Sequence, residues 1–348
     1  MRALQYHEIG QPPAIQMIDA PTAGPGQVLL RILAAGVCHS DQFVMSLPES
    51  EYSFGLPLTL GHECVGEVLQ LGQGAAGVEI GDLVALYGPW GCGTCVPCVR
   101  GEENYCLHAA RLGIKPPGMG APGGMADLLL VDDPRHLVPL GGLDPVAAVC
   151  LTDAGLTPYH AIKNELDLLG PGSTAVVVGA GGLGHVAIQL LRALTSAKVV
   201  VVDISEEKLD LAREMGAHEV LLSGDSCGQR VLELTGGVGA EVVFDLVGND
   251  ATLDLARRVV RINGSIVIVG VGGGLLPTGF FATPYGVRVR APLWGTRDEL
   301  LEVFELARQG LVEVQVETHP LEAGPAVYER LRQGLVRGRA VLLPSLTP

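Results

Sequence analysis

Four cysteines lie within a segment of fifteen residues, in the pattern Cys92-x2-Cys95-x2-Cys98-x7-Cys106. The chain begins without a basic and apolar secretory signal, so we expect a cytoplasmic, reducing environment in which thiolates bind metals and disulfides are rare. Four thiolates complete the tetrahedral shell of zinc and leave no position open, which predicts a structural zinc site. Disulfides and an iron–sulfur cluster are the alternatives, and the fourth cysteine lacks the following proline of bacterial ferredoxins.

A second set of possible metal ligands is dispersed along the chain. Cys38 lies in AAGVCHSD and His62 in LTLGHECVG, both beside glycines in turn-like segments. A catalytic zinc takes three protein ligands and keeps one position open. The segment CLTDAGLT (150–157) reads as the first turn of a helix, which would place Cys150 and Asp153 on one face as candidates for the third ligand. Residue types alone do not decide between Cys150 and Asp153. The alternative for Cys38 and His62 is ordinary core packing, which is the more common role of a lone Cys or His side chain.

A glycine-rich turn in the second half of the chain has the pattern G-x-G-x-x-G. It follows the apolar run Thr174–Val178 and opens a helix that continues to Leu194. In that context the glycines allow a tight turn, a close approach of the backbone to a pyrophosphate, and close packing of helix on strand. The helix N-terminus faces the negative charge. The residues expected at the pyrophosphate are Gly179, Gly181, Gly182, Leu183 and Gly184.

The end of the next strand predicts which dinucleotide is bound. Asp203 lies 24 residues after Gly179 and would accept hydrogen bonds from the ribose hydroxyls while repelling a 2′-phosphate. NAD(H) is therefore favoured over NADP(H). Lys208 could weaken that preference if it lay near the ribose, although a solvated helix lysine is the simpler reading. A glycine-rich packing turn followed by a strand-end Asp is the alternative without a ligand.

Two rhythms of secondary structure divide the chain. The first 150 residues read as short strands separated by Gly, Pro and Asp, with an irregular loop at 115–125, which predicts a mostly-β body. Its clearest strands are expected at Val28–Ile32, Cys64–Leu69, Leu83–Leu86 and Leu128–Val131. From Ser173, apolar strands alternate with helices, which predicts a parallel sheet covered on both faces. Its later strands are expected at Lys198–Val202, Glu219–Leu222, Glu241–Leu246 and Ser265–Val269.

The alternation stops near the C-terminus. We expect a strand at Val287–Leu293, a helix at Arg297–Gln309 and a β-like tail to Pro348, with the chain returning to the first domain. At 348 residues and 48% hydrophobic content, the chain is long enough to bury two cores.

Composition disfavours two classes of partner. The net charge of −15 argues against nucleic acids and anionic membranes, because both attract basic surfaces. Residues 168–191 carry no formal charge, but six glycines and Pro171 divide them into strand, turn and helix. They therefore do not predict a membrane span.

The ordered set of motifs resembles the zinc-dependent medium-chain alcohol dehydrogenase family over essentially the whole chain. The matching pieces are Gly-Val-Cys38-His-Ser-Asp41, Gly61-His62-Glu63 with Gly66, the four-cysteine segment, the glycine-rich turn and Asp203. YGPWGCGTC and LTDAGLTPYHAI are most similar to bacterial secondary-alcohol dehydrogenases that accept bulky aryl ketones. The resemblance implies an α/β protein with a GroES-like, mostly-β catalytic domain (1–153 and 295–348) and a Rossmann domain built on a doubly wound parallel sheet (154–294).

The resemblance also implies roles for individual residues. The third catalytic ligand of the family lies four residues before the Thr of a T-x-Y segment, here Thr157-Pro-Tyr159, which assigns it to Asp153 and leaves Cys150 as a small buried residue. Glu63 corresponds to an occasional fourth ligand or to a group that tunes the metal. Ser40 corresponds to the hydroxyl that passes the alcohol proton outward.

One position departs from the family pattern. Some relatives end the proton relay at a His five residues after the first Cys ligand, where this chain has Phe43. His39 is the replacement we expect in the relay, and Phe43 is expected to wall the substrate pocket. The other expected pocket residues are Phe54, Met119 and Trp294, with core packing as the alternative.

Further contacts are implied at the cofactor and between subunits. Val247 and Val271 are expected beside the cofactor, and Arg339 in RGRAVL resembles an arginine that contacts the pyrophosphate, with a surface arginine as the alternative. Val287–Leu293 resembles the strand that pairs across the family's dimer interface. A homodimer or homotetramer is therefore expected.

The implied function is that of an NAD-dependent secondary-alcohol dehydrogenase or ketone reductase with two zinc ions per subunit. Zinc polarises the substrate oxygen, hydride moves between the substrate carbon and nicotinamide C4, and Ser40 starts the proton relay. Alternatives are a polyol- or aldehyde-directed member of the family, a zinc-free quinone reductase, and a non-catalytic NAD-binding protein.

Overall fold

The structure, a computed structural model, describes residues 1–345 and divides them into two compact units. The first unit contains Met1–Asp153, Thr296–Arg308 and the chain from Val314 on, and the second contains Ala154–Gly295 and Gln309–Glu313. The last three residues of the expected C-terminal tail, 346–348, lie outside the described residues. Within residues 1–345, no helix combines the length and the apolar character that crossing a bilayer requires.

The first unit is built on β-sheet, as its short apolar runs predict. A three-stranded sheet has the order β2 (Ala14–Met17), β1 (Arg2–Tyr6), β4 (Leu58–Thr59). A seven-stranded sheet has the order β15 (Val316–Pro320), β16 (Arg339–Leu343), β3 (Val28–Val37), β5 (Glu63–Leu71), β6 (Leu83–Leu86), β8 (Leu137–Pro139), and β7 (Leu128–Val131) also pairs with β3. The four strands expected in this region are confirmed in β3, β5, β6 and β7, and residues 115–125 form a loop.

Short helices connect these strands. They are α1 (His39–Ser46), α2 (Val96–Val99), α3 (Ala109–Leu112), α4 (Pro145–Val149), α10 (Arg297–Arg308) and α11 (Gly324–Arg332), with 3-10 turns at Glu103–Tyr105, Pro134–His136, Cys150–Thr152 and Leu321–Ala323. The expectation of a wholly β-like C-terminal tail is wrong, because α11 lies within it. Pro325 suits the first turn of a helix, and buried Val327, Tyr328 and Leu331 give this helix its packed face.

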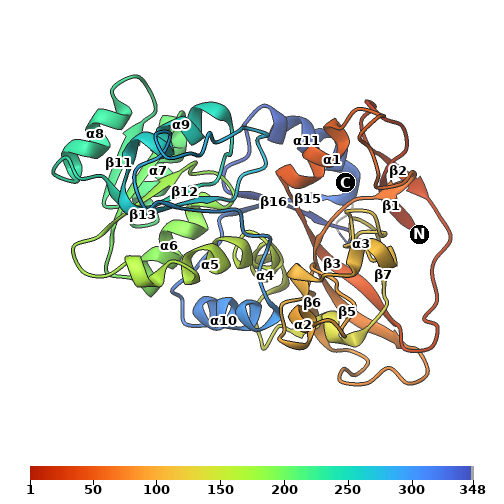
Figure 1. Ribbon diagram of the computed structural model, residues 1–348. Coiled ribbons are helices and arrows are strands. Elements are labelled where there is room, and N and C mark those ends of the chain that lie inside the picture. The colour runs from red at the N-terminus through yellow and green to blue at the C-terminus, as the bar shows by residue number, and fades with distance from the viewer. Residues whose placement is uncertain (346–348) are drawn as a thin grey trace. The chain divides into compact units, whose positions relative to one another are not determined.

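The second unit carries the predicted parallel sheet. Its six strands have the order β11 (Glu219–Leu222), β10 (Lys198–Asp203), β9 (Thr174–Val178), β12 (Ala240–Asp245), β13 (Val260–Ile268), β14 (Arg288–Arg290), and every pairing is parallel. Counted along this unit, that order is 3-2-1-4-5-6, the doubly wound Rossmann arrangement. Its helices are α5 (Leu156–Lys163), α6 (Gly184–Leu194), α7 (Glu206–Glu214), α8 (Cys227–Leu234) and α9 (Asp250–Val259), with a 3-10 turn at Leu166–Leu168 (Figure 1).

The last strand of this sheet is shorter than expected. β14 covers only Arg288–Arg290 of the predicted Val287–Leu293. Pro292 has no backbone N–H to donate to a sheet, which explains why pairing does not continue to Leu293.

Candidate active site

Strand register brings three distant parts of the first unit together. In the antiparallel pair β3–β5, Gly36 lies opposite Glu63, so Cys38 just after β3 lies near His62 just before β5. β16 pairs with the other edge of β3 and places Ala340 opposite Val37. Glycine at position 36 leaves room for the buried Glu63, because a Cβ there would collide with its carboxylate.

These strands gather four residues with metal-binding side chains. Cys38, His62, Glu63 and Asp153 are all buried, and their possible ligand atoms lie within 4.8 Å of one another. Asp153 Oδ2 is 3.6 Å from Cys38 Sγ and 3.4 Å from His62 Nε2. At zinc bond lengths of about 2.0–2.3 Å, neighbouring tetrahedral ligands lie about 3.3–3.8 Å apart. The spacing therefore fits one zinc ion.

The chemistry of this group also fits a metal. Burying a thiol, an imidazole and two carboxyl groups together is costly unless charge is compensated. Among the residues that the structure describes, Glu63 Oε2 is buried without a hydrogen-bond partner. Burial raises the pKa of Glu63, and the nearby positive charge of Arg339 offsets only part of that effect. A divalent cation would supply the missing counter-charge.

The local conformation of CLTDAGLT differs from the expected first helical turn. α4 ends at Val149, Cys150–Thr152 form a 3-10 turn, and Asp153 has φ −131° and ψ −59°, outside a helix. Cys150 and Asp153 therefore do not share a helical face. Cys150 is fully buried, burial raises the pKa of its thiol to about 12, and it is not part of the four-residue group.

Asp41 holds two members of this group, a role that the sequence reasoning missed. Its Oδ1 accepts a hydrogen bond from His62 Nδ1 at 2.9 Å, and its Oδ2 accepts one from the Cys38 backbone N–H at 3.1 Å. Because a carboxylate only accepts, His62 carries its proton on Nδ1 and turns Nε2 toward the group. Burial lowers the pKa of His62, but the charge of Asp41 and the hydrogen bond with Asp153 raise it well above its ordinary value. Its position as the third residue of α1, where acidic side chains cap helices, was the available signal.

Arg339 is buried beside the same group. It is only 3% exposed, so the alternative of a surface arginine is wrong. Its Nη2 forms an ion pair with Glu63, and its Nη1 donates to Cys38 Sγ at 3.7 Å. Burial lowers the pKa of Arg339, but the negative charges of Glu63 and Cys38 outweigh this effect and raise it. Contact with a pyrophosphate stays a prediction.

The expected proton relay residues lie on α1. Ser40 is partly exposed, and its Oγ lies 3.6 Å from Cys38 Sγ. His39 is exposed, and Phe43 is 41% exposed. The first two turns of α1 thus carry a hydroxyl beside the metal-binding group and an imidazole at the surface.

The other expected pocket residues have mixed surroundings. Phe54 and Met119 are partly buried and pack against the core of the first unit. Trp294, in the second unit, is buried and has a positive φ of 51°. Their role in a substrate pocket stays a prediction.

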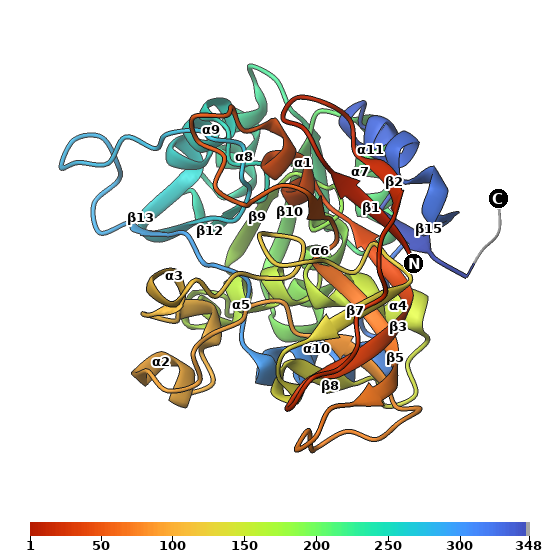
Figure 2. The same cartoon turned by 90° about the vertical axis from the view of Figure 1, so that its right-hand side faces the viewer.

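The four clustered cysteines form a second group suited to zinc, and their segment includes the short helix α2 (Figure 2). Cys95 Sγ lies 3.3 Å from Cys98 Sγ and 3.8 Å from Cys106 Sγ, and no disulfide joins any cysteine of the described chain. Backbone amides at Cys92, Cys95 and His108 donate to cysteine sulfurs. A hydrogen bond from Thr94 is the main cause that lowers the pKa of Cys92 to about 5. Thiolates stabilised in this way are the ligands that zinc requires.

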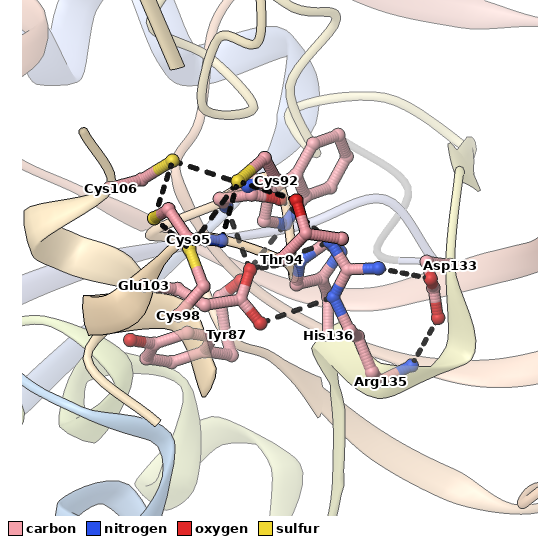
Figure 3. A network of polar contacts seen from close by, with 12 residues as sticks. Tyr87, Cys92, Thr94, Cys95, Cys98, Glu103, Cys106, Asp133, Arg135 and His136 are labelled. Atoms are coloured by element: carbon pink, nitrogen blue, oxygen red, sulfur yellow. Dashed lines mark hydrogen bonds and ion pairs between the residues drawn. The ribbon is translucent and has the colours of Figure 1, made fainter. Parts of the chain in front are cut away.

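Glu103 ties this cysteine segment to the rest of the first unit, and the sequence reasoning missed it. Its carboxylate accepts hydrogen bonds from the Gly91 backbone at 2.8 Å, from Arg135 Nε at 3.1 Å and from His136 Nε2 at 3.2 Å (Figure 3). Arg135 Nη2 also donates to the Gly91 carbonyl at 2.7 Å. No spacing rule links residue 103 to residues 135–136, so the sequence offered no signal for the pair.

The glycine-rich turn of the second unit has the expected backbone. Gly179 has φ +97°, which favours glycine, and a Cβ on Gly184 would collide with the Gly179 carbonyl. α6 begins at Gly184, so its unsatisfied N–H groups lie at this turn. Asp203 ends β10 and accepts hydrogen bonds from Ala180 N at 2.7 Å and Ser205 N at 3.0 Å. These bonds hold its carboxylate beside the turn.

The remaining expected cofactor residues are partly or largely exposed. Val247 and Val271 follow β12 and β13, at the carboxyl end of the sheet where dinucleotides bind in this fold. Lys208 is half-buried on α7. Asp245, which no motif singled out, accepts hydrogen bonds from the backbone of Val247 and Gly248 and from Thr252.

Comparison with known proteins agrees with this geometry. Residues 24–142 match the family described as alcohol dehydrogenase GroES-like domain, and residues 182–309 match the one described as zinc-binding dehydrogenase. The NAD-dependent alcohol dehydrogenase of Sulfolobus acidocaldarius is 35% identical over 98% of this chain and 99% of its own.

Two solved structures extend the comparison to the fold. The alcohol dehydrogenase of Aeropyrum pernix superposes with a TM-score of 0.91 at 37% identity, over 99% of this chain and 100% of its own. Acetophenone reductase from Geotrichum candidum, solved in complex with NAD, has a TM-score of 0.85 at 30% identity, over 98% of this chain and 97% of its own. With both domain descriptions matched and the likeness spanning the full length, this chain belongs to the zinc-dependent medium-chain alcohol dehydrogenase family.

Proposed function

We propose that this protein is an NAD(H)-dependent, zinc-containing dehydrogenase that interconverts small secondary alcohols and ketones. The observation that carries the proposal is the buried group of Cys38, His62, Glu63 and Asp153, whose possible ligand atoms lie within 4.8 Å of one another. A purely structural zinc site would use four tightly binding ligands, as the clustered cysteines do. Here Cys38, His62 and Asp153 supply three ligands and Glu63 is engaged by Arg339, so one position is left for substrate.

Each residue has a distinct task in this proposal. Cys38, His62 and Asp153 hold the catalytic zinc, and Glu63 is kept beside it by its ion pair with Arg339. Bound there, zinc supplies Lewis-acid polarisation of the substrate oxygen, while NAD(H) supplies or accepts the hydride. Ser40, partly exposed beside Cys38, takes the alcohol proton, and His39 passes it to solvent.

The second unit binds the cofactor. The pyrophosphate lies at the N-terminus of α6, and Asp203 accepts hydrogen bonds from the adenosine ribose. Asp203 is held by Ala180 and Ser205, which keeps its charge where a 2′-phosphate would be repelled. Val247 and Val271 pack against the bound cofactor, Lys208 lies near the ribose, and Arg339 contacts the pyrophosphate.

The preferred substrates are aryl and alkyl ketones and the corresponding alcohols. Phe43, Phe54, Met119 and Trp294 would give an apolar lining that cannot satisfy the hydroxyls of a polyol. Acetophenone reductase among the structural relatives supports this class. The active protein is a cytoplasmic homodimer or homotetramer. β14, which among the described strands pairs only with β13, is the sheet edge that would join two subunits.

Kinetics and metal analysis test the proposal together. We expect two zinc ions per subunit, turnover of 1-phenylethanol with NAD+, and a kcat/KM at least about tenfold lower with sorbitol or with NADP+. Purified protein with one zinc or none per subunit, or with sorbitol as its better substrate, would contradict the corresponding part of the proposal. An active enzyme without zinc would favour a quinone reductase.

A further inference from the structure

A tyrosine from the C-terminal helix reaches the residue that holds the metal-binding group. Tyr328 lies on α11 and is 4% exposed. Its hydroxyl donates a hydrogen bond to Asp41 Oδ2 at 2.8 Å and lies 3.2 Å from Met125 Sδ. Figure 1 shows α11 beside α1, the helix that begins after Cys38 and carries Asp41.

A second hydrogen bond locks the same two helices. Gln42, the residue after Asp41, donates from Nε2 to the backbone carbonyl of Tyr328 at 2.8 Å. Adjacent residues of α1 thus hold the side chain and the backbone of Tyr328. This reciprocal pair fixes the direction of the phenol more firmly than packing alone would.

Asp41 accepts three hydrogen bonds that have different effects. The bond from His62 Nδ1 goes to Oδ1, while the bonds from the Cys38 amide and from Tyr328 go to Oδ2. Two of the three donors therefore belong to residues of the metal-binding group. The third donor, Tyr328, lies outside that group and comes from α11.

We infer that Tyr328 is a positioning residue for the catalytic zinc group, acting through Asp41 on both His62 and Cys38. The inference rests on the proposed function, because it assigns Tyr328 a task toward the metal named there. Hydrogen-bonded partners of metal ligands set the tautomer, the ring orientation and the basicity of those ligands. Without the phenol, Oδ2 keeps only the Cys38 amide bond, and the carboxylate can rotate away from His62 Nδ1.

The tyrosine is suited to be a constant donor. Burial and the adjacent charge of Asp41 hold the pKa of Tyr328 well above its ordinary value. The raised pKa favours the protonated hydroxyl, which is the form that donates to Asp41. Phenylalanine would keep the ring and its packing in the core and would remove only the donor.

The test is chelator-driven zinc release from the full-length protein, with Tyr328→Phe compared with wild type. We expect two release phases in wild type, one for each zinc. In Tyr328→Phe one phase should accelerate by up to about tenfold and the other should stay unchanged. A direct hydrogen-bonded partner of a ligand is worth about 10- to 100-fold in metal affinity, and Tyr328 acts one step further out, through Asp41. Asp41→Asn should accelerate the same phase and so identify it.

Tyr6→Phe is the matched control. Tyr6 is a buried tyrosine of the same core whose hydroxyl bonds to the Met45 carbonyl and the Gly10 amide and makes no contact with Asp41 that the structure records. Its loss should lower the melting temperature and leave both zinc phases unchanged. Equal acceleration of zinc release in Tyr6→Phe and Tyr328→Phe would show that Tyr328 contributes only to folding stability, and would overturn the inference.

Cobalt substitution gives a readout that stability does not move. With Co²⁺ bound at the catalytic site, where Cys38 supplies the one thiolate, the visible spectrum of Tyr328→Phe should shift relative to wild type. The spectrum of Tyr6→Phe should match that of wild type. Unchanged zinc release and an unchanged cobalt spectrum in Tyr328→Phe would contradict this inference and leave the proposed function standing. Wild-type protein that releases fewer than two zinc ions would instead refute the proposed function.

Discussion

At the scale of single residues, the choice between Cys150 and Asp153 shows how position outweighs ligand strength. A thiolate binds zinc more tightly than a carboxylate does, yet Cys150 is not part of the four-residue group, and burial raises the pKa of its thiol to about 12. Asp153 instead lies within 3.4–3.6 Å of His62 and Cys38 side chains. The two residues do not share a helical face, because Cys150 begins a 3-10 turn and Asp153 follows it with non-helical dihedral angles.

This difference predicts the outcome of two single substitutions. Asp153→Ala should lose the catalytic zinc and lower kcat/KM by more than about a hundredfold, because even the outer partners of metal ligands are worth about 10- to 100-fold. Cys150→Ala should keep two zinc ions and nearly full activity, at a stability cost of about 1 kcal/mol for a small cavity. Zinc content and steady-state kinetics check both, and the reverse pattern would assign the ligand to Cys150.

At the scale of elements, the cysteine segment depends on a contact with a distant turn. Glu103 lies between the third and fourth cysteines and bonds to Arg135 and His136, while Arg135 also holds the Gly91 carbonyl just before the first cysteine (Figure 3). Four ligands define a zinc shell by themselves. The Glu103 network instead determines how the segment is anchored to its unit.

The pKa of Glu103 predicts a pH dependence of that anchoring. Burial raises the pKa of this carboxyl group, but hydrogen bonds from His136 and Arg135 outweigh burial and lower it below the ordinary 4.5. A lowered folded-state pKa means that Glu103 stabilises the fold above about pH 4.5 and loses that effect as pH falls through the folded-state pKa. Glu103→Gln should therefore lower the free energy of unfolding at neutral pH by about 1.5–3 kcal/mol, as expected for hydrogen bonds to a charged group.

Guanidinium unfolding between about pH 3 and pH 7 checks this expectation. The difference between wild type and Glu103→Gln should shrink as the pH falls below 4.5. The neighbouring Glu102 has no recorded side-chain partner in the described chain, so Glu102→Gln should follow wild type at every pH. A Glu103→Gln deficit that persisted unchanged into acid would show that charge has no part in the anchoring.

At the scale of the whole molecule, the metal-binding residues and the glycine-rich turn proposed to bind the cofactor lie in different units. Both metal-binding groups lie entirely in the first unit, whereas the glycine-rich turn and Asp203 lie in the second. The glycine-rich turn and Asp203, which we propose bind the cofactor, should therefore keep their local structure without metal. Gly179 and Gly184, for example, are held by their own strand and helix.

Removal of zinc should accordingly abolish turnover of the alcohol while NADH binding persists. Protein stripped of zinc by a chelator should lose activity with 1-phenylethanol, while its Kd for NADH, measured by fluorescence titration, should rise less than about tenfold, or 1.4 kcal/mol. Re-addition of zinc should restore activity. A complete loss of NADH binding in the stripped protein would contradict the assignment.

The features that could be predicted from sequence are those whose residues lie close together along the chain. The cysteine group closes within fifteen residues, and the glycine-rich turn with its strand and helix within about thirty, so local geometry settles both. The apolar runs likewise predict the parallel sheet, because buried strands with no polar face have few other arrangements.

Only the tertiary structure decided which distant side chains complete the catalytic group. Register in the β3–β5 and β16–β3 pairs places Glu63 and Arg339 beside Cys38, and a one-residue slip would turn each to the opposite face. Tyr328 and Glu103 were missed for the same reason, since their partners are set by packing over separations of up to 287 residues. The sequence by itself determined the ligand types and the glycine-rich turn. Tertiary packing determined which of those side chains meet, because contacts between remote segments depend on the register and burial of every strand between them.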